Sequence, residues 1–224
     1  MSTRWKIGRI YAWLLARLLF GFQVINRPKP VTNQGKILVA NHLSNLDPFF
    51  VALACGQEVY FMAKEELFNV SRFFRWLITF WNAIPLPRSK VQTTVLKKCL
   101  ALLKENKTLV IFPEGTRNKS DDILLPFKPG IGYLAINGQV PVIPVAIFGV
   151  REVWHGRLAK LIDKDISRYF KTNSKLPKIK NRVIVEFGHP IYPNQYEKSR
   201  AGYDQFTQTI RAKLQTMLIK YLAR

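Results

Sequence analysis

The sequence predicts an α/β fold with a central mixed, largely parallel sheet covered by helices. Short apolar runs alternate with longer amphipathic segments along the chain, as strands alternate with helices in such folds. A length of 224 residues with 48% apolar side chains allows one domain with a full hydrophobic core. Polar side chains follow two of the apolar runs, at the position where open α/β sheets bind their ligands.

Residues 1–31 are predicted to form an N-terminal membrane-associated helical segment, ahead of an α/β domain over residues 32–224. Lys6, Arg9 and Arg17 interrupt its apolar and aromatic run, so every uncharged stretch is shorter than the roughly 18 residues of a spanning helix. On a helical wheel these three cations fall within about 80°, opposite a broad apolar face. The pattern favours an amphipathic helix in the membrane interface. A helix packed on the domain and a tilted span or signal anchor are the alternatives.

Apolar periodicity places the elements of the α/β domain. Strands are predicted at residues 37–40, 59–63, 108–112 and 182–187, and helices at residues 48–55, 71–81, 89–105, 130–136 and 203–223. The helix at 71–81 is strongly aromatic and either joins the core or faces lipid. Pro141 and Pro144 predict an edge or interrupted strand in the run VPVIPVAIFG. The basic stretch from residue 157 to about 182 is expected to be sparsely structured.

The first polar turn contains His42 and Asp47, which bracket the connection between a predicted strand and a predicted helix. Asp47 followed by Pro48 predicts a helix start, with the aspartate capping free backbone N–H groups. A histidine acts as a general base when a carboxylate orients its ring, and this short turn lets Asp47 reach back to His42. The alternative is that Asp47 is only a cap and His42 a solvated loop residue.

The second polar turn is FPEGTR, which follows the strand predicted at 108–112. Gly115 allows a ligand to approach the backbone, Thr116 offers a hydroxyl, and Arg117 can hold a phosphate through two hydrogen bonds. Glu114 would repel a phosphate, so we expect it to bind a substrate hydroxyl or to orient Arg117. The alternative is a turn with a solvated ion pair.

Three further cations, Lys64, Arg88 and Lys128, lie at predicted element boundaries, where together with Arg117 they suggest a phosphate pocket. The net charge of +21 also favours an anionic partner, which is a phosphate-bearing substrate, an anionic lipid surface or a nucleic acid. The cysteines at 55 and 99 both lie in apolar helical patterns. They indicate neither a disulfide framework nor a metal site, and they fit a reducing compartment.

Four motifs in this order resemble those of the glycerolipid acyltransferases, most closely the bacterial 1-acyl-sn-glycerol-3-phosphate acyltransferase type. They are NHLSNLD with Asn41, His42 and Asp47, the segment ending IPLPR at Arg88, FPEGTR at 112–117, and VPVIPV at 140–145. The resemblance covers roughly residues 37 to 150. It includes the contexts FMAKEELF and PFKPG, which contain Lys64 and Lys128.

The second motif departs from the family pattern at two positions. Asn82 stands where the family usually has glycine, and Pro85 where it usually has an aromatic residue. Arg88, which follows them, is therefore a weaker candidate for the phosphate than Arg117.

The resemblance implies transfer of a fatty acyl group from acyl-CoA or acyl carrier protein to the 2-hydroxyl of lysophosphatidic acid. The product is phosphatidic acid, so the expected role is in phospholipid biosynthesis. By the same resemblance, His42 and Asp47 of the HX4D motif are the general base and its orienting partner. No covalent acyl-enzyme, metal or redox cofactor is expected. The residues expected to bind substrate are Lys64, Arg88, Glu114, Gly115, Thr116, Arg117 and Lys128.

Such an enzyme is expected to be membrane-associated, at the cytoplasmic face of a bacterial inner membrane, with an anionic lipid surface and no nucleic acid as partner. Seven basic residues and no acidic one precede Asp47, which favours attraction to anionic lipid. Within the same class, the alternative is an acyltransferase for glycerol 3-phosphate or another lysolipid. The alternative from another class, a basic nucleic-acid-binding protein, leaves the ordered motifs unexplained.

Overall fold

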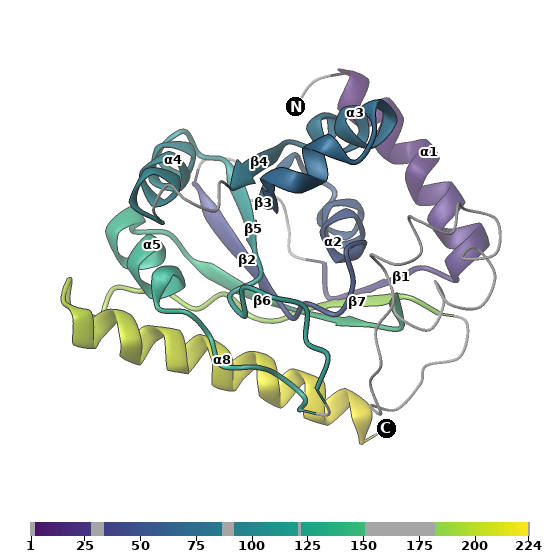
Figure 1. Cartoon of the computed structure of the whole chain (residues 1–224). Coiled ribbons are helices and arrows are strands. Elements are labelled where there is room, and N and C mark those ends of the chain that lie inside the picture. The colour runs from purple at the N-terminus through teal and green to yellow at the C-terminus, as the bar shows by residue number, and fades with distance from the viewer. Residues whose placement is uncertain (1–2, 28–33, 87–91, 121, 151–181, 224) are drawn as a thin grey trace.

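The structure of the chain is a computed structural model, and it describes residues 3–27, 34–86, 92–120, 122–150 and 182–223 (Figure 1). The strands among these residues are β1 (Gln23–Ile25), β2 (Lys36–Ala40), β3 (Val59–Lys64), β4 (Ala83–Leu86), β5 (Thr108–Ile111), β6 (Val142–Phe148) and β7 (Ile184–Phe187). The helices among them are α1 (Thr3–Phe20), α2 (Asp47–Cys55), the short 3-10 helix η1 (Glu65–Asn69), α3 (Arg72–Phe80), α4 (Gln92–Lys104), α5 (Gly130–Gly138) and α8 (Arg200–Leu222).

These seven strands form one sheet in the order β1-β7-β6-β2-β5-β3-β4. Among the described strands, the pair β6–β7 is antiparallel and the other neighbouring pairs are parallel. Figure 1 shows α1, α2 and α3 on one face of the sheet and α4, α5 and α8 on the other. The predicted α/β fold with a mixed, largely parallel sheet covered by helices is confirmed.

The central strands are apolar at every position because both of their faces are covered. β2, β5 and β6 are buried along their whole length. In β2, Leu38 and Ala40 face the core beneath α1 and α2, whereas Ile37 and Val39 face the core beneath α4, α5 and α8. Two hydrophobic layers therefore fix this strand, and with it the turn that follows Ala40.

The prediction of an edge or interrupted strand at VPVIPVAIFG is wrong, because β6 lies between β2 and β7 and is buried throughout. Pro141 precedes the strand, and its carbonyl accepts a hydrogen bond from the Ile37 N–H at 3.0 Å. Pro144 lies opposite Gly188, the residue just after the end of β7. The Pro144 carbonyl accepts a hydrogen bond from the Gly188 N–H at 2.8 Å. The hydrogen bond that Pro144 cannot donate is therefore missing at the end of the β6–β7 ladder and not within it.

The N-terminal strand and the start of the last helix differ most clearly from the prediction. β1 was not predicted, because its three residues lie inside the apolar N-terminal pattern; it pairs in parallel with β7, so the N-terminal segment contributes to the sheet. α8 begins at Arg200, three residues before the predicted start, and the Ser199 Oγ caps it by accepting from the Gly202 N–H at 3.1 Å. The basic stretch from 157 lies outside the described residues, and the division of the chain at residue 31 stays a prediction.

The N-terminal helix α1 combines two of the alternatives that its sequence left open. Its inner side packs on the domain through Trp5 and Ala16, which are 2% and 4% exposed. Its outer side is apolar and uncovered, with Tyr11 71% and Leu18 82% exposed. Among the described residues, no helix has the length and apolar character needed to cross a bilayer.

Both cysteines are free thiols in the core, Cys55 in α2 and Cys99 in α4. Burial raises the pKa of the Cys99 thiol to about 11, and burial likewise raises the pKa of Cys55. We therefore expect an aromatic disulfide reagent at pH 8 to react with the native protein about 100-fold more slowly than with the protein in guanidinium, because the thiolate is the reactive form. Absorbance of the released thiolate measures both rates, and rapid reaction of one thiol in the native protein would contradict this burial.

Candidate active site

Polar segments follow β2 and β5 at the same edge of the sheet. The two strands are paired in parallel, so their carboxyl ends lie together, and β3 pairs in parallel with β5 on the other side. The turn with His42 leaves β2, the FPEGTR turn leaves β5, and Lys64 ends β3. Residues from three separate parts of the sequence are therefore at the edge where a ligand site was predicted.

His42 and Asp47 form the predicted pair. The His42 Nδ1 and the Asp47 Oδ2 are 2.9 Å apart; the Asp47 side chain is fully buried and the His42 side chain is 18% exposed. Because the carboxylate accepts this hydrogen bond, Nδ1 carries the hydrogen and Nε2 is the nitrogen that can take another proton. The arrangement is that of a general base with its orienting carboxylate.

The expectation that Asp47 caps α2 is wrong. The N-cap position is occupied by Leu46, without a side-chain cap, and Asp47 is the first residue of the helix. Its Oδ2 turns back and accepts from the N–H groups of Leu43 and Ser44, each at 2.6 Å, as well as from the imidazole. Donors in the preceding turn and the imidazole thus bind the carboxylate in place of the N–H groups of the helix.

The FPEGTR turn and the residue that follows it, Asn118, make three contacts with His42. The Glu114 Oε1 accepts from the His42 N–H at 2.7 Å, and the His42 carbonyl accepts from the Asn118 N–H at 2.7 Å. The Phe112 ring lies against the imidazole with centroids 4.4 Å apart and planes inclined by 32°. The backbone and ring of His42 are therefore positioned by the turn that begins at Phe112, 70 residues later in the sequence.

Glu114 is 5% exposed and braces two loops. Besides the His42 N–H, its second oxygen, Oε2, accepts from the Leu125 N–H at 3.0 Å. Burial raises the pKa of the Glu114 carboxyl, and the two backbone hydrogen bonds oppose that shift. Its predicted contact with a substrate hydroxyl or with Arg117 stays a prediction.

Arg117 and Lys128 lie at the same turn. Burial lowers the pKa of the half-buried Arg117 guanidinium, whereas the nearby negative charge of Asp47 raises it, which places Arg117 within electrostatic reach of the base pair. Gly115 has φ of +69°, and a Cβ there would lie 2.6 Å from the Lys128 Cε and 2.7 Å from its Nζ. The positive φ favours glycine here, and a larger residue would push aside the flexible end of Lys128.

For the other residues predicted to bind substrate, no hydrogen bond with His42 or Asp47 is seen among the described residues. Thr116 is exposed in the FPEGTR turn, and Lys64 is exposed at the end of β3. Arg88 lies outside the described residues. Asn82, at the position where the second motif departs from its family, has φ of +58°, a conformation that suits glycine and that asparagine tolerates. Its Nδ2 donates to the Val59 carbonyl at 3.2 Å, so the departure is accommodated.

Two buried asparagines support the site without having been assigned a role from sequence. The Asn41 side chain exchanges two hydrogen bonds with the backbone of Ile147, at 2.8 and 3.0 Å, and so fixes the end of β2 to β6. The Asn118 Oδ1 accepts from the Ser120 N–H at 2.9 Å, and its Nδ2 donates to the Asp122 carbonyl at 2.8 Å. The polar run after FPEGTR is the signal that predicts such an Asn-centred turn.

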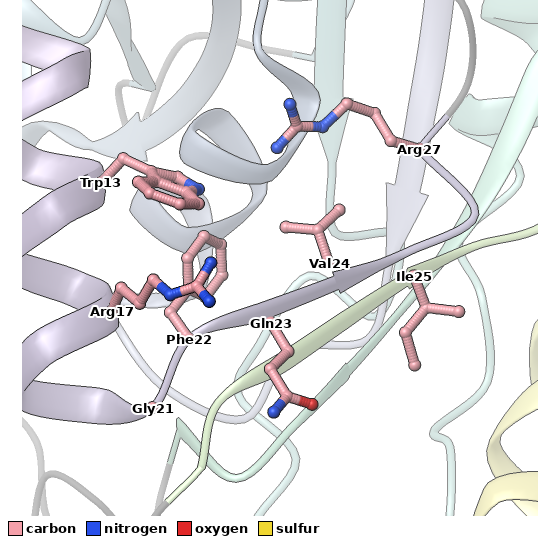
Figure 2. A pocket seen from close by; sticks show the side chains of 8 residues that line it. All are labelled: Trp13, Arg17, Gly21, Phe22, Gln23, Val24, Ile25 and Arg27. Atoms are coloured by element: carbon pink, nitrogen blue, oxygen red, sulfur yellow. The ribbon is translucent and has the colours of Figure 1, made fainter.

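A cavity of about 690 Å³ lies elsewhere, between α1 and β1. Figure 2 shows Trp13 and Arg17 reaching into it from α1, with Phe22 and Arg27 from the β1 segment. None of the residues predicted for the active site lines it. Among the described residues no group of three His, Cys, Asp or Glu could hold a metal ion, and the expectation that no metal or cofactor takes part stays a prediction.

Comparisons with known proteins agree with this arrangement. The model of the acyltransferase family matches residues 22–148. A chloroplastic 1-acyl-sn-glycerol-3-phosphate acyltransferase of Brassica napus, BAT2, is 32% identical over 148 residues, which are 61% of this chain and 42% of that protein. The 1-acyl-sn-glycerol-3-phosphate acyltransferase of Streptococcus pneumoniae is 29% identical over 189 residues, 84% of this chain and 60% of that protein.

Similarity to a solved structure extends over the whole chain. The crystal structure of the 1-acyl-sn-glycerophosphate (LPA) acyltransferase PlsC from Thermotoga maritima matches with a TM-score of 0.65 and 26% identity, covering 100% of this chain and 85% of that one. The chain spans 42% and 55% of the length of the first two curated relatives that it matches.

The bracing by Glu114 predicts a specific pH dependence of stability. Because burial raises its pKa in the folded state, the folded protein binds this proton more tightly than the unfolded chain does, and stability is lost as the pH rises through the folded-state pKa. Glu114→Gln should remove that decline. At pH 7 it should also lower the free energy of unfolding by about 1–3 kcal/mol, because an amide nitrogen faces one of the two N–H donors.

Urea unfolding from pH 4 to pH 8 measures both effects, and Glu65→Gln, at an exposed position in η1, is the matched control. A parallel loss of stability with pH in the parent protein and in Glu114→Gln would show that this carboxyl does not titrate as its burial indicates.

Proposed function

The chain belongs to the acyltransferase family, and from this premise we propose that it transfers a fatty acyl group from acyl-CoA or acyl carrier protein to the 2-hydroxyl of lysophosphatidic acid. The observation that carries the proposal is the hydrogen-bonded pair of His42 and Asp47, with the charge of Arg117 beside it. The acceptor is supported by the plant and bacterial relatives named 1-acyl-sn-glycerol-3-phosphate acyltransferases.

In the proposed reaction, His42 Nε2 takes the proton from the acceptor hydroxyl as its oxygen attacks the thioester carbonyl. Asp47 keeps the ring oriented and stabilises the imidazolium, and such a base contributes about 10²- to 10⁴-fold in rate. A new ester bond forms, the carbon–sulfur bond breaks, and the proton passes from Nε2 to the departing thiolate, which leaves as a free thiol. The Ser44 hydroxyl, which is buried and accepts from the Leu46 N–H at 3.3 Å, is not placed as a nucleophile.

The acceptor phosphate is proposed to lie against Arg117 and Lys128. Arg117 supplies a planar fork of donors beside the base pair, and Lys128 adds a positive charge where it crosses Gly115. Lys64 and Arg88 are proposed as further cations for the acceptor or for the phosphates of the donor. Glu114, Gly115 and Thr116 are proposed to shape the acceptor site.

The exposed apolar side of α1 supports a peripheral position on a membrane, where both the acceptor and the product reside. We propose the cytoplasmic face of a bacterial inner membrane, with anionic lipid attracting the net charge of +21. Two free buried thiols fit that reducing compartment. The donor is proposed as a substrate, and no resident cofactor is needed for acyl transfer.

The proposal is tested with purified protein in an assay that offers lysophosphatidic acid, glycerol 3-phosphate and lysophosphatidylcholine as acceptors. Each is combined with a palmitoyl thioester of CoA or of acyl carrier protein, and phosphatidic acid is measured by mass spectrometry. The highest kcat/KM is expected with lysophosphatidic acid. A higher value with glycerol 3-phosphate or with the choline lysolipid would replace the proposed acceptor, and absence of transfer to all three would refute the function.

Replacing the proposed base gives the sharpest mutational prediction. His42→Ala should lower kcat by at least about 10²-fold, because the acceptor hydroxyl loses its proton acceptor. The variant should stay folded, since the imidazole is partly exposed and its backbone partners remain. Thermal unfolding checks the fold and initial rates check the chemistry; His189→Ala, at an exposed position, is the control. Undiminished kcat would remove His42 from its role.

Arg117→Ala should act mainly on acceptor binding. Loss of a charge-assisted, two-bond contact of about 1.5–3 kcal/mol predicts a roughly 10- to 100-fold rise in KM for lysophosphatidic acid. The KM for the acyl donor should change much less. Arg200→Ala, at an exposed position at the start of α8, serves as the control. If the variant leaves the acceptor KM unchanged, Arg117 does not bind the phosphate.

A further inference from the structure

The helix α3 presents a row of aromatic rings to solvent. Phe73 is 69% and Trp76 60% exposed, whereas Ile78, on the opposite side, is the one buried residue of this helix. The centroids of Phe73 and Trp76 are 5.9 Å apart, and those of Trp76 and Phe80 are 5.8 Å apart. Within the predicted aromatic segment, Phe73 and Trp76 are therefore outside the core, whereas Trp81 is buried and Phe80 packs against the core.

This row continues the apolar side of α1. The ring of Phe80 lies over Gly8, where a Cβ would be 2.7 Å from the Phe80 Cζ, and Trp5 contacts Trp81 edge to face with centroids 5.5 Å apart. Figure 1 shows α3 beside the N-terminal part of α1. The exposed apolar residues of α1 include Ile7, Ile10, Tyr11, Leu14, Leu15 and Leu18. With Phe73 and Trp76, they form what we call the α1–α3 surface.

The charges around the α1–α3 surface favour an anionic partner. Neither helix contains an acidic residue, whereas the exposed Lys6 and Arg17 lie on α1 and the exposed Arg72 and Arg75 lie on α3. An apolar face bordered by arginine and lysine fits the interface of an anionic bilayer, where aromatic rings lie at the level of the headgroups. Contiguous exposed patches of this kind mark interaction sites.

We infer that α3 is a second bilayer-contacting element, and that Phe73 and Trp76 insert into the headgroup region together with the outer side of α1. The inference rests on the proposed function in that the acceptor and product are lipids. Two helices that contact the bilayer fix the rotation of the domain about α1, which one helix alone leaves free. η1 joins α3 to Lys64 at the end of β3, so contact through α3 also holds the edge that carries His42 close to the lipid.

The test measures binding to sucrose-loaded vesicles of phosphatidylcholine with phosphatidylglycerol, which supplies the anionic surface, without acyl donor or acceptor. Phe73→Ser/Trp76→Ser should lower the partition coefficient about tenfold or more, because two large apolar side chains no longer leave water. Tyr192→Ser/Ile219→Ser is the matched control, since those side chains are 56% and 47% exposed on other elements, and it should bind like the parent. Unchanged thermal midpoints confirm that both variants are folded.

A second measurement locates one ring directly. Vesicles with brominated acyl chains should quench part of the tryptophan emission of the parent, and Trp76→Phe should remove part of that quenching. Equal quenching in the two proteins, or equal partitioning of Phe73→Ser/Trp76→Ser and the parent, would overturn the inference. It would also be overturned if that variant bound vesicles normally but lost binding to acyl carrier protein or lost a concentration-dependent dimer, because the surface would then serve a protein partner.

These outcomes are separable from the proposed function. Vesicle binding is measured without turnover, so loss of binding in Phe73→Ser/Trp76→Ser supports the inference even if the parent transfers no acyl group to lysophosphatidic acid. Conversely, acyl transfer by the parent with no change of vesicle binding in the variant would retain the function and remove α3 from the membrane contact.

Discussion

The buried carboxylate of Asp47 is the constraint on which the site depends. A carboxylate that is fully removed from water is unfavourable unless several donors bind it. Here one oxygen accepts from the His42 ring and from the N–H groups of Leu43 and Ser44, and the positive charge of Arg117 lies nearby. The same contacts that compensate burial also fix the turn and the direction of the imidazole. Stability of the loop and readiness for proton transfer therefore have one physical origin.

The site is made by two turns that are distant in sequence and adjacent in space. The parallel pairing of β2 and β5 brings them to one edge, and Glu114 and Asn118 then bind the backbone N–H and carbonyl of His42. A buried carboxylate in the second turn thus positions the base in the first one. This explains why an acidic residue stands next to a proposed phosphate site: its oxygens face two backbone donors and not the ligand.

The sequence predicted what depends on local pattern and on spacing. The apolar run before His42 predicted β2. The interval of five residues from His42 to Asp47 predicted that the imidazole and the carboxylate form a pair. The cap assigned to Asp47 was wrong because Leu46 occupies the N-cap position, and Asp47, already inside the helix, turns its Oδ2 back to donors in the preceding turn. β6 was wrongly predicted to be an edge or interrupted strand because prolines are typical of edge strands. Pro144 instead lies opposite Gly188, at the end of the β6–β7 ladder. The bond between Asn41 and Ile147 joins residues that local periodicity does not relate.

The outermost described strands of the sheet are short: β1 has three residues and β4 has four, one of them Pro85, which has no N–H to donate. Long unpaired edges are templates on which a second molecule adds its own strand, and short or proline-containing edges suppress this. Molecules confined to a lipid surface meet one another far more often than molecules in bulk solution. If the chain lies on a lipid surface as proposed, such short outer strands let its molecules crowd there without polymerising through their backbones.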